Sequence, residues 1–391
     1  RQVIRAIDAL RSAGNLRDGV PLGNGGTLRI LSGRLESDET GLELDIADNR
    51  IVRLAYQLHK KGEHVIFVSK DINARLKADA LGIQAEDFEK QKVNIDELYT
   101  GYAEITVPGS MIDAFFKSKI LNADELRFFP NEFVLLKDRN NEKHMALGRV
   151  VKPGTITHLS SQYELVWNIQ ARNKEQRLAL ELLMDPEVQI VTLVGQAGTG
   201  KTLLALAAGL HMTIRHRRYD RILVSRPVIP MGKDIGYLPG AKEEKLSHWM
   251  QPIFDNLTYL LREDTGEAGA KKRKVKASAQ EKAEKLLREN TIVLEALTYI
   301  RGRSIPGQYV VVDEAQNLTP HEVKTIVSRA GEHTKMVLTG DPYQIDNPYL
   351  DASSNGLIYA AECLKEQTIH GHVTLKNSVR STLAAVAAEY L

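Results

Sequence analysis

The stretch Val188-Gln-Ile-Val-Thr-Leu-Val-Gly195-Gln-Ala-Gly198-Thr-Gly200-Lys201-Thr202 decides the fold of this chain. Its apolar first half predicts a buried strand, and the apolar run Leu203–Leu210 that follows predicts a helix. The residues between them fit the pattern G-x-x-x-x-G-K-[ST], in which glycines let backbone N–H groups converge on a phosphate. The helix that starts at this loop adds a dipole favourable to the same anion. The stretch therefore predicts a nucleotide site.

The loop pattern also predicts roles for two side chains. Lys201 is expected to reach the β- and γ-phosphates of ATP, and the Thr202 hydroxyl is expected to hold Mg²⁺. ATP and Mg²⁺ are therefore the predicted cofactors. The residues expected to contact the nucleotide here are Gly195, Gln196, Ala197, Gly198, Thr199, Gly200, Lys201, Thr202 and Leu203.

The composition is that of a soluble globular protein, with 43% hydrophobic and 26% charged residues among 391, enough for two or three domains. A net charge of +2 requires any nucleic-acid surface to be a local patch. The single cysteine, Cys363, and the lack of an apolar run near ~20 residues predict a cytoplasmic protein without a membrane span. Arg1 and Leu391 both lie inside helical patterns, so we expect the natural protein to continue at both ends.

Strands and helices alternate in the first 90 residues. Thr27–Leu31 and His64–Val68 are predicted strands, and helices are predicted after Asp48 and Asp71. This alternation indicates an α/β fold with a parallel sheet. Asp45, Asp48 and Asp71 lie near strand ends and helix starts, where ligands collect in such sheets, but Asp48 and Asp71 would also serve as helix N-caps.

The segment Leu44–Ile51, followed by Val65–Asp71, resembles the later half of a PIN nuclease domain. That resemblance implies a carboxylate cluster that holds Mg²⁺ or Mn²⁺ and activates water to cleave RNA. Asp48 and Asp71, together with Asp45, are the implied ligands. The family's first strand and its leading aspartate would precede Arg1, so we expect an incomplete cluster and little nuclease activity in this chain.

The middle of the chain, residues 99–166, changes to a β-rich pattern. A short helix is predicted near Met111–Lys117, and Asp138–Asn141 is predicted to be a hairpin turn. This segment holds no catalytic constellation, so a connector domain is expected, with an added RNA-contacting surface as the alternative. The predicted strands are Tyr102–Val107, Glu132–Leu136, His144–Val151 and Thr155–Leu159.

Three further segments are candidate ligand contacts. Gln176 lies in a helix predicted to start at Asn173, and its amide can read an adenine edge, although an ordinary surface position is the alternative. The Pro- and Gly-rich loop 226–240 is expected to contact nucleotide or substrate, or to be merely structural. The basic run Lys271–Lys276 is either a solvated surface loop or a site for RNA phosphates.

Two later strands end in polar residues. The apolar strand Gln308–Val312 is followed by Asp313 and Glu314 and is expected beside the phosphate-loop strand. Asp313 would then hold Mg²⁺ through water, and Glu314 would orient and deprotonate the attacking water. A further strand, Lys335–Thr339, precedes Gln344, which is expected to sense the γ-phosphate.

The ordered motifs together resemble the PhoH-type ATPases, and in detail the branch in which a PIN domain precedes the ATPase. They are also similar to motifs of superfamily-one helicases, so the resemblance implies ATP-driven RNA unwinding with linked RNA cleavage. The expected fold is α/β, with a RecA-like P-loop ATPase domain at 168–391, a partial PIN-like domain at 1–90 and a small β-rich domain at 91–167. The motifs are Gly195–Thr202, Ser225–Pro227, Gly236–Gly240, Arg301–Arg303, Asp313–Asn317, Gly340–Gln344 and Arg380–Ser381.

Only one RecA-like lobe fits after Val188, whereas those helicases have two. A cation for the γ-phosphate would then come from a neighbouring copy, which predicts a homo-oligomeric ring, a hexamer. Single-stranded RNA is the other expected partner. Arg380 matches the family motif and is the candidate, with an exposed first-turn arginine, or an arginine acting in cis, as the alternatives. Two other functions stay open: a nucleotide-gated module that binds RNA or protein, and a metal-dependent ribonuclease with the ATPase as an assembly platform.

Overall fold

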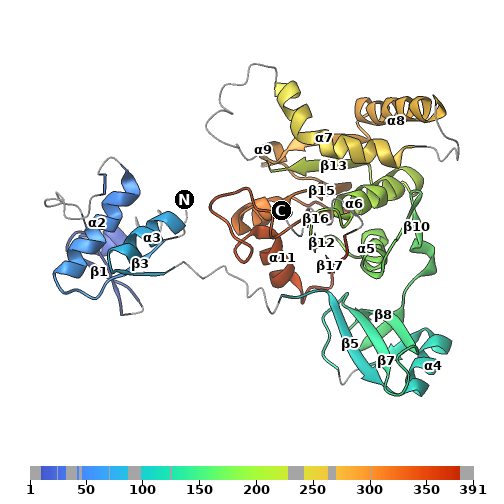
Figure 1. Ribbon diagram of the computed structural model, residues 1–391, viewed down its shortest axis with the longest axis horizontal. Coiled ribbons are helices and arrows are strands. Elements are labelled where there is room, and N and C mark those ends of the chain that lie inside the picture. Colours follow the sequence, from blue (N-terminus) through green and yellow to red (C-terminus); the bar gives the residue numbers. More distant parts are fainter. Residues whose placement is uncertain are drawn as a thin grey trace. The chain divides into compact units, whose positions relative to one another are not determined.

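The computed structural model describes residues 10–23, 25–31, 42–43, 46–69, 71–86, 98–123, 126–227, 242–262, 270–300 and 302–378. The chain divides into two compact units, Arg1–Glu89 and Lys90–Leu391 (Figure 1). The predicted division of the second unit at residue 167 stays a prediction. None of the described helices is long and apolar enough to cross a membrane.

The first unit is a small α/β structure. Strands β3 and β4 pair in parallel, as the alternating pattern predicted, and Val52, Phe67 and Ala78 lie in the core between this pair and helices α2 and α3. The predicted strand at Thr27–Leu31 is shorter, because only its first two residues pair. The elements are the 3₁₀ turn Arg11–Ala13, β1 (Val20–Pro21), β2 (Thr27–Leu28), α2 (Ala47–Lys60), β3 (Ile66–Val68), α3 (Ile72–Ala80) and β4 (Gln84–Glu86).

The second unit begins with a five-stranded mixed sheet in the order β5-β7-β8-β9-β6, with α4 packed against it. The four predicted strands and the helix are present, and residues 139–144 form the turn of the β7–β8 hairpin. Strand β6 was not predicted, because three residues are too few for a pattern. The elements are β5 (Tyr102–Val107), α4 (Gly109–Ser118), β6 (Ile120–Asn122), β7 (Phe133–Asp138), β8 (Met145–Lys152) and β9 (Thr155–His158).

Buried polar contacts tie this sheet to the rest of the unit. The Arg149 guanidinium lies 2.8 Å from an Asp185 carboxylate oxygen and donates to Asn131 Oδ1 at 2.6 Å. Asn131 Nδ2 donates to the main-chain oxygens of Thr368 and His370 at 2.8 and 2.7 Å. Because these groups are largely removed from water, their pairing fixes the sheet against β17.

The largest sheet has six parallel strands in the order β14-β13-β15-β16-β12-β17. The prediction that Gln308–Val312 lies beside the phosphate-loop strand was wrong, because β16 is inserted between β15 and β12. Strand β14 was not predicted. The strands are β12 (Ile190–Gly195), β13 (Arg221–Arg226), β14 (Ile292–Ala296), β15 (Gln308–Val312), β16 (Lys335–Gly340) and β17 (His370–Leu375).

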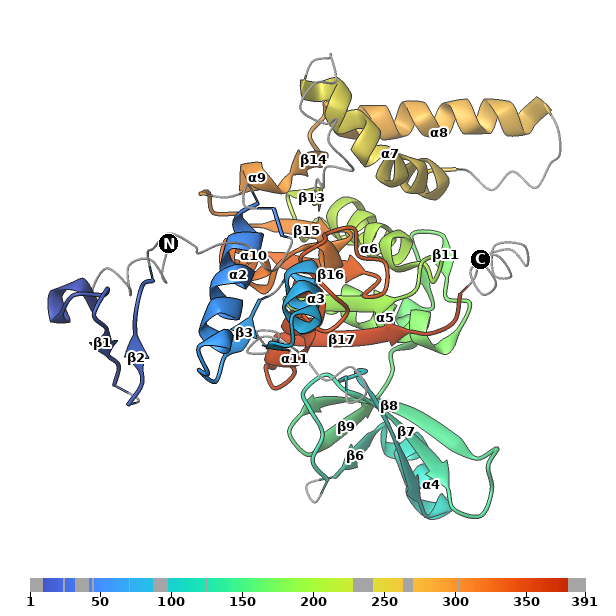
Figure 2. The same ribbon diagram turned by 60° about the vertical axis from the view of Figure 1, so that its left-hand side comes forward.

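Helices cover both faces of this sheet, since the strands are apolar on both sides. Val191 and Leu193 of β12 face one core with α5, α6, α7 and α8, while Ile190 and Val194 face a second core with α9, α10 and α11. Figures 1 and 2 show α7 and α8 next to each other at the β14 edge. The helices are α5 (Lys174–Met184), α6 (Lys201–Leu210), α7 (Lys242–Leu260), α8 (Ala270–Arg288), α9 (Leu297–Ile300), α10 (Pro320–Val327) and α11 (Gly356–Leu364).

Short elements complete the second unit. The two-residue strands β10 and β11 form an antiparallel pair ahead of α5, and a π-helical turn continues α6. They are the 3₁₀ turn Ser161–Tyr163, β10 (Leu165–Val166), β11 (Ile169–Gln170), the π turn His211–Arg215 and the 3₁₀ turn Ala315–Asn317.

A fully buried lysine at the start of β16 holds the end of α5. Lys335 Nζ donates to the main-chain oxygens of Leu182, Asp185 and Val188 at 2.8, 2.6 and 2.7 Å. These carbonyls lie at and just beyond the C-terminus of α5, where no helical N–H remains to pair with them. Burial lowers the pKa of the Lys335 ammonium to about 7, so its charge depends on these contacts.

Candidate active site

The phosphate loop joins β12 to α6 in the shape that its glycines allow. Gly200 has φ = 91° and is the N-cap of α6, and Gly195 lies so close to β17 that a Cβ would stand 2.3 Å from Leu375 O. Side chains other than hydrogen would strain or block both positions. Lys201 Nζ lies over the loop and donates to the carbonyl oxygens of Gly195 and Gln196 at 2.6 and 2.8 Å. A cation is thereby held where phosphate oxygens would approach.

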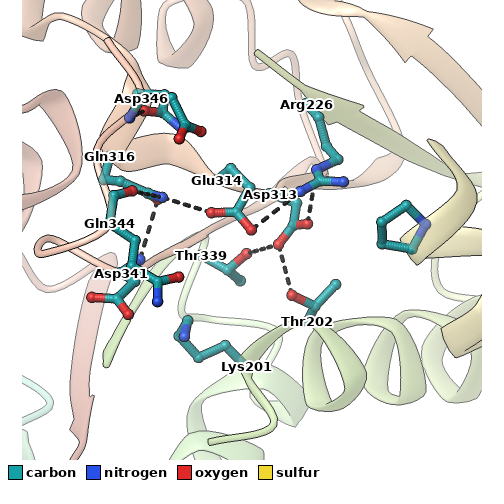
Figure 3. Close-up of polar contacts among 12 residues, drawn as sticks. Lys201, Thr202, Arg226, Asp313, Glu314, Gln316, Thr339, Asp341, Gln344 and Asp346 are labelled. Atoms are coloured by element: carbon teal, nitrogen blue, oxygen red, sulfur yellow. Dashed lines mark hydrogen bonds and ion pairs between the residues drawn. The ribbon is translucent and has the colours of Figure 1, made fainter. Parts of the chain in front are cut away.

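Thr202, at the start of α6, and Asp313, just after β15, meet at the carboxyl ends of the strands (Figure 3). They do so although β16 separates β15 from β12, the strand that leads into α6. Thr202 Oγ1 donates to Asp313 Oδ1 at 2.7 Å, and Thr339 Oγ1 from β16 donates to the same oxygen at 2.7 Å. The inserted strand therefore supports the pair instead of separating it. A hydroxyl and a carboxylate oxygen side by side are the hard oxygen ligands that Mg²⁺ prefers.

Glu314 follows Asp313 in a left-handed backbone conformation, with φ = 56° and ψ = 37°. This conformation is uncommon for a residue with a side chain and marks a position held by its surroundings. Its carboxylate has two partners: Arg226 Nη2 lies 3.2 Å from Oε1, and Gln316 Nε2 donates to Oε2 at 2.6 Å. Arg226 Nε also lies 3.3 Å from Asp313 Oδ2, so one guanidinium spans both carboxylates.

The fully buried Gln316 connects this acidic pair to the loop after β16. Its Nε2 also donates to the main-chain oxygen of Gln344 at 2.9 Å, and its Oε1 accepts from the Asp341 N–H at 3.2 Å. Asp341 in turn accepts the Ala197 N–H of the phosphate loop at 2.9 Å. The chain of contacts links the base candidate Glu314 to the phosphate loop through buried amide groups.

Gln344 itself has an exposed side chain, and only its main chain joins this network. Gln176 is buried: its Nε2 donates to Thr199 O at 3.0 Å and its Oε1 accepts from the Arg172 N–H at 2.9 Å. The amide keeps one N–H and one lone pair beyond these contacts. The expected roles of Gln344 and Gln176 toward ATP stay predictions.

Four residues of the site had no individual role in the sequence analysis. Three of them stand inside a recognised motif and Thr339 directly precedes one, but a motif does not say which side chains pair. The structure assigns the pairing because the strand ends converge at one sheet edge. The four are Arg226, Gln316, Thr339 and Asp341.

The three aspartates predicted as metal ligands in the first unit have different places in the structure. Asp71 is the N-cap of α3, and its Oδ1 accepts the N–H groups of Asn73 and Ala74 at 2.7 and 3.2 Å. Asp48 is not an N-cap, because α2 starts earlier, at Ala47, which places Asp48 exposed in the first turn. Asp45 lies outside the described residues. Within the described ranges no group of three or more potential metal-binding side chains is found, and the PIN-like metal site stays a prediction.

Some predicted contacts fall elsewhere. Arg380, Arg301 and residues 228–240 of the long loop lie outside the described residues. The basic run Lys271–Lys276 is not a surface loop but part of α8, which begins at Ala270. Lysine, arginine and alanine are strong helix formers, which explains the difference.

A glycine-rich loop between a buried parallel strand and a helix, with Thr202 and Asp313 paired at the same sheet edge, defines a P-loop ATPase with a RecA-like fold. The PhoH-like protein family matches residues 168–390 and the PIN domain family matches residues 1–89. The chain belongs to the PhoH-like protein family, in the branch with a PIN domain in front.

Several relatives match the chain over its whole length. It is 46% identical to protein PhoH2 of Bacillus subtilis and covers 88% of that protein. It is 36% identical to protein PhoH2 of Thermobispora bispora and covers 85% of it. Among solved structures, the Pif1 helicase from Candida albicans is similar over 56% of this chain and 43% of its own, with a TM-score of 0.29 and 15% identity. That likeness is too low to assign a function.

Proposed function

We propose that this protein is a cytoplasmic Mg²⁺-dependent ATP hydrolase that binds single-stranded RNA and unwinds RNA duplexes. The observation that carries the proposal is the 2.7 Å contact between Thr202 and Asp313 with Glu314 next in sequence. A metal-binding pair, a neighbouring carboxylate and a phosphate loop at one sheet edge suit phosphoryl transfer to water.

Each residue has a part in this reaction. Lys201 leaves the loop carbonyls and binds the β- and γ-phosphates, and Glu314 orients the attacking water and accepts its proton. Gln344 senses the γ-phosphate, and Gln176 binds the adenine edge. Thr202 and Asp313 would hold Mg²⁺, which would neutralise phosphate charge.

RNA as the substrate is supported by the PIN domain match at residues 1–89, because that family cleaves RNA. Asp45, Asp48 and Asp71 are the proposed Mg²⁺ or Mn²⁺ ligands of the coupled ribonuclease. The ring, a hexamer, is supported by the single RecA-like sheet found in the described part of the chain. In a ring, Arg380 of one copy would complete the site of the next.

The test is ATP turnover of the full chain with and without a short single-stranded RNA. RNA is expected to raise the rate, and Glu314→Gln is expected to lower kcat by at least ~10²-fold while ATP binding is kept. Glu366→Gln removes an equal charge at an exposed position and serves as the control, with an unchanged rate. Near-normal turnover of Glu314→Gln would remove this residue from the mechanism.

The competing function is a nucleotide-gated module that captures RNA or protein without unwinding. Strand displacement from a fluorescent duplex with a single-stranded overhang separates the two. ATP hydrolysis without displacement, together with nucleotide-dependent RNA binding, would favour the module.

A further inference from the structure

Both carboxylate oxygens of Glu314 already have donors. Oε1 faces Arg226 Nη2 at 3.2 Å, and Oε2 accepts from Gln316 Nε2 at 2.6 Å. A general base must have an oxygen within hydrogen-bond reach of the water whose proton it takes. Each oxygen keeps a second lone pair, but the two donors fix the orientation of the carboxylate, so withdrawal of one would let Glu314 turn toward the attacking water.

Arg226 is the donor that can withdraw. Gln316 is fully buried and is held by two further partners, the Gln344 oxygen and the Asp341 N–H. Arg226 stands at the end of β13, its side chain keeps 18% of its surface exposed, and its contacts to the two carboxylates, at 3.2 and 3.3 Å, are longer than the 2.6 Å bond from Gln316. Of the two donors, the partly exposed Arg226 is therefore the one that an anion from solvent can approach.

A phosphodiester oxygen is the anion that the proposed function supplies. Guanidinium binds phosphate through paired N–H donors, in a geometry that a single long contact to Glu314 does not offer. We propose that Arg226 is a positioning residue that restrains Glu314 until a backbone phosphate of RNA binds the guanidinium. This inference rests on the proposed function and explains how RNA would control ATP turnover at a residue on β13.

The test compares Arg226→Gln with wild type in the full chain. Without RNA, kcat is expected to rise by roughly three- to tenfold, which corresponds to about 0.7–1.4 kcal/mol, with an unchanged KM for ATP. The ratio of RNA-stimulated to basal turnover is expected to fall toward one. Arg226→Lys, which keeps the charge but loses the fork of donors, should lie between. Arg221→Gln, at the exposed opposite end of the same strand, is the control.

Two results would overturn the inference. One is a fall in basal kcat of folded Arg226→Gln, since Arg226 would then assist the chemistry. The other is a stimulation ratio equal to that of wild type. The double variant Arg226→Gln/Glu314→Gln must be inactive, because the rise in kcat requires Glu314 as the base. If Arg226→Gln does not fold, the ratio of RNA-stimulated to basal turnover is measured in Arg226→Lys instead, and a ratio equal to that of wild type overturns the inference. A wild-type protein whose turnover ignores RNA contradicts the proposed function itself.

Discussion

Replacing Gln316 by methionine removes the buried amide that joins the acidic pair to the loop after β16. The substituted side chain has nearly the same length and fills the same space, so packing changes little. What is lost are the hydrogen bonds to Glu314 Oε2 at 2.6 Å, to Gln344 O at 2.9 Å and from the Asp341 N–H at 3.2 Å.

The expected loss of stability follows from the partners left behind. The Asp341 N–H is buried, and leaving it unsatisfied costs about 1–3 kcal/mol, whereas the part-buried Gln344 oxygen can pair with water and adds little. Glu314 is half-buried and can turn to solvent, so it adds little. We expect Gln316→Met to lower the free energy of unfolding by about 1–3 kcal/mol. Because Glu314 would then keep only its contact to Arg226, the residue that restrains it, kcat should fall by about tenfold or more.

Urea unfolding followed by fluorescence, with ATP turnover on the same samples, measures both effects. Gln344→Met is the matched control, because the Gln344 side chain is exposed and only its main-chain oxygen contacts Gln316. The control is expected to unfold like wild type while its kcat falls through loss of the γ-phosphate contact. An unfolding free energy of Gln316→Met within about 0.5 kcal/mol of wild type would refute the network as an energetic link.

Two further predictions concern pH and assembly. The pKa of Lys335 is lowered to about 7 in the folded state from 10.5, so the unfolded chain binds more protons between these values. The stability from this group is present above pH 10.5 and is lost as pH falls toward 7, by up to about 1.4 kcal/mol per pH unit. Urea titrations at about pH 7.5 and about pH 9 should show this pH dependence in wild type and not in Lys335→Met. An equal pH dependence in the two proteins would contradict the prediction. Lys201→Ala and Arg380→Ala proteins should each be inactive alone but regain ATPase activity after subunit exchange, whereas co-assembly without recovery would argue against donation in trans.

Local patterns predicted most of the elements, because the relevant forces act over a few residues. The sequence correctly indicated the strand–loop–helix of Val188–Leu210, the strand Tyr102–Val107 and the capping aspartate of α3. Short or polar elements escaped prediction: β6 has three residues, and β4 is the polar run Gln84–Glu86. The run Lys271–Lys276 was predicted as a loop from its charge but is helical, because lysine and arginine are strong helix formers.

The sequence by itself determined the chemistry of the site: a phosphate loop, a lysine, a threonine and two carboxylates in motifs whose spacing is local. Only the tertiary structure decided the order of the strands, which placed β16 between β12 and β15 and brought Thr339 to Asp313. It also decided that Arg226 and Gln316 hold Glu314 between them. Such pairings join residues up to 88 positions apart, and no local periodicity encodes them, because strand order is settled by the packing of whole faces.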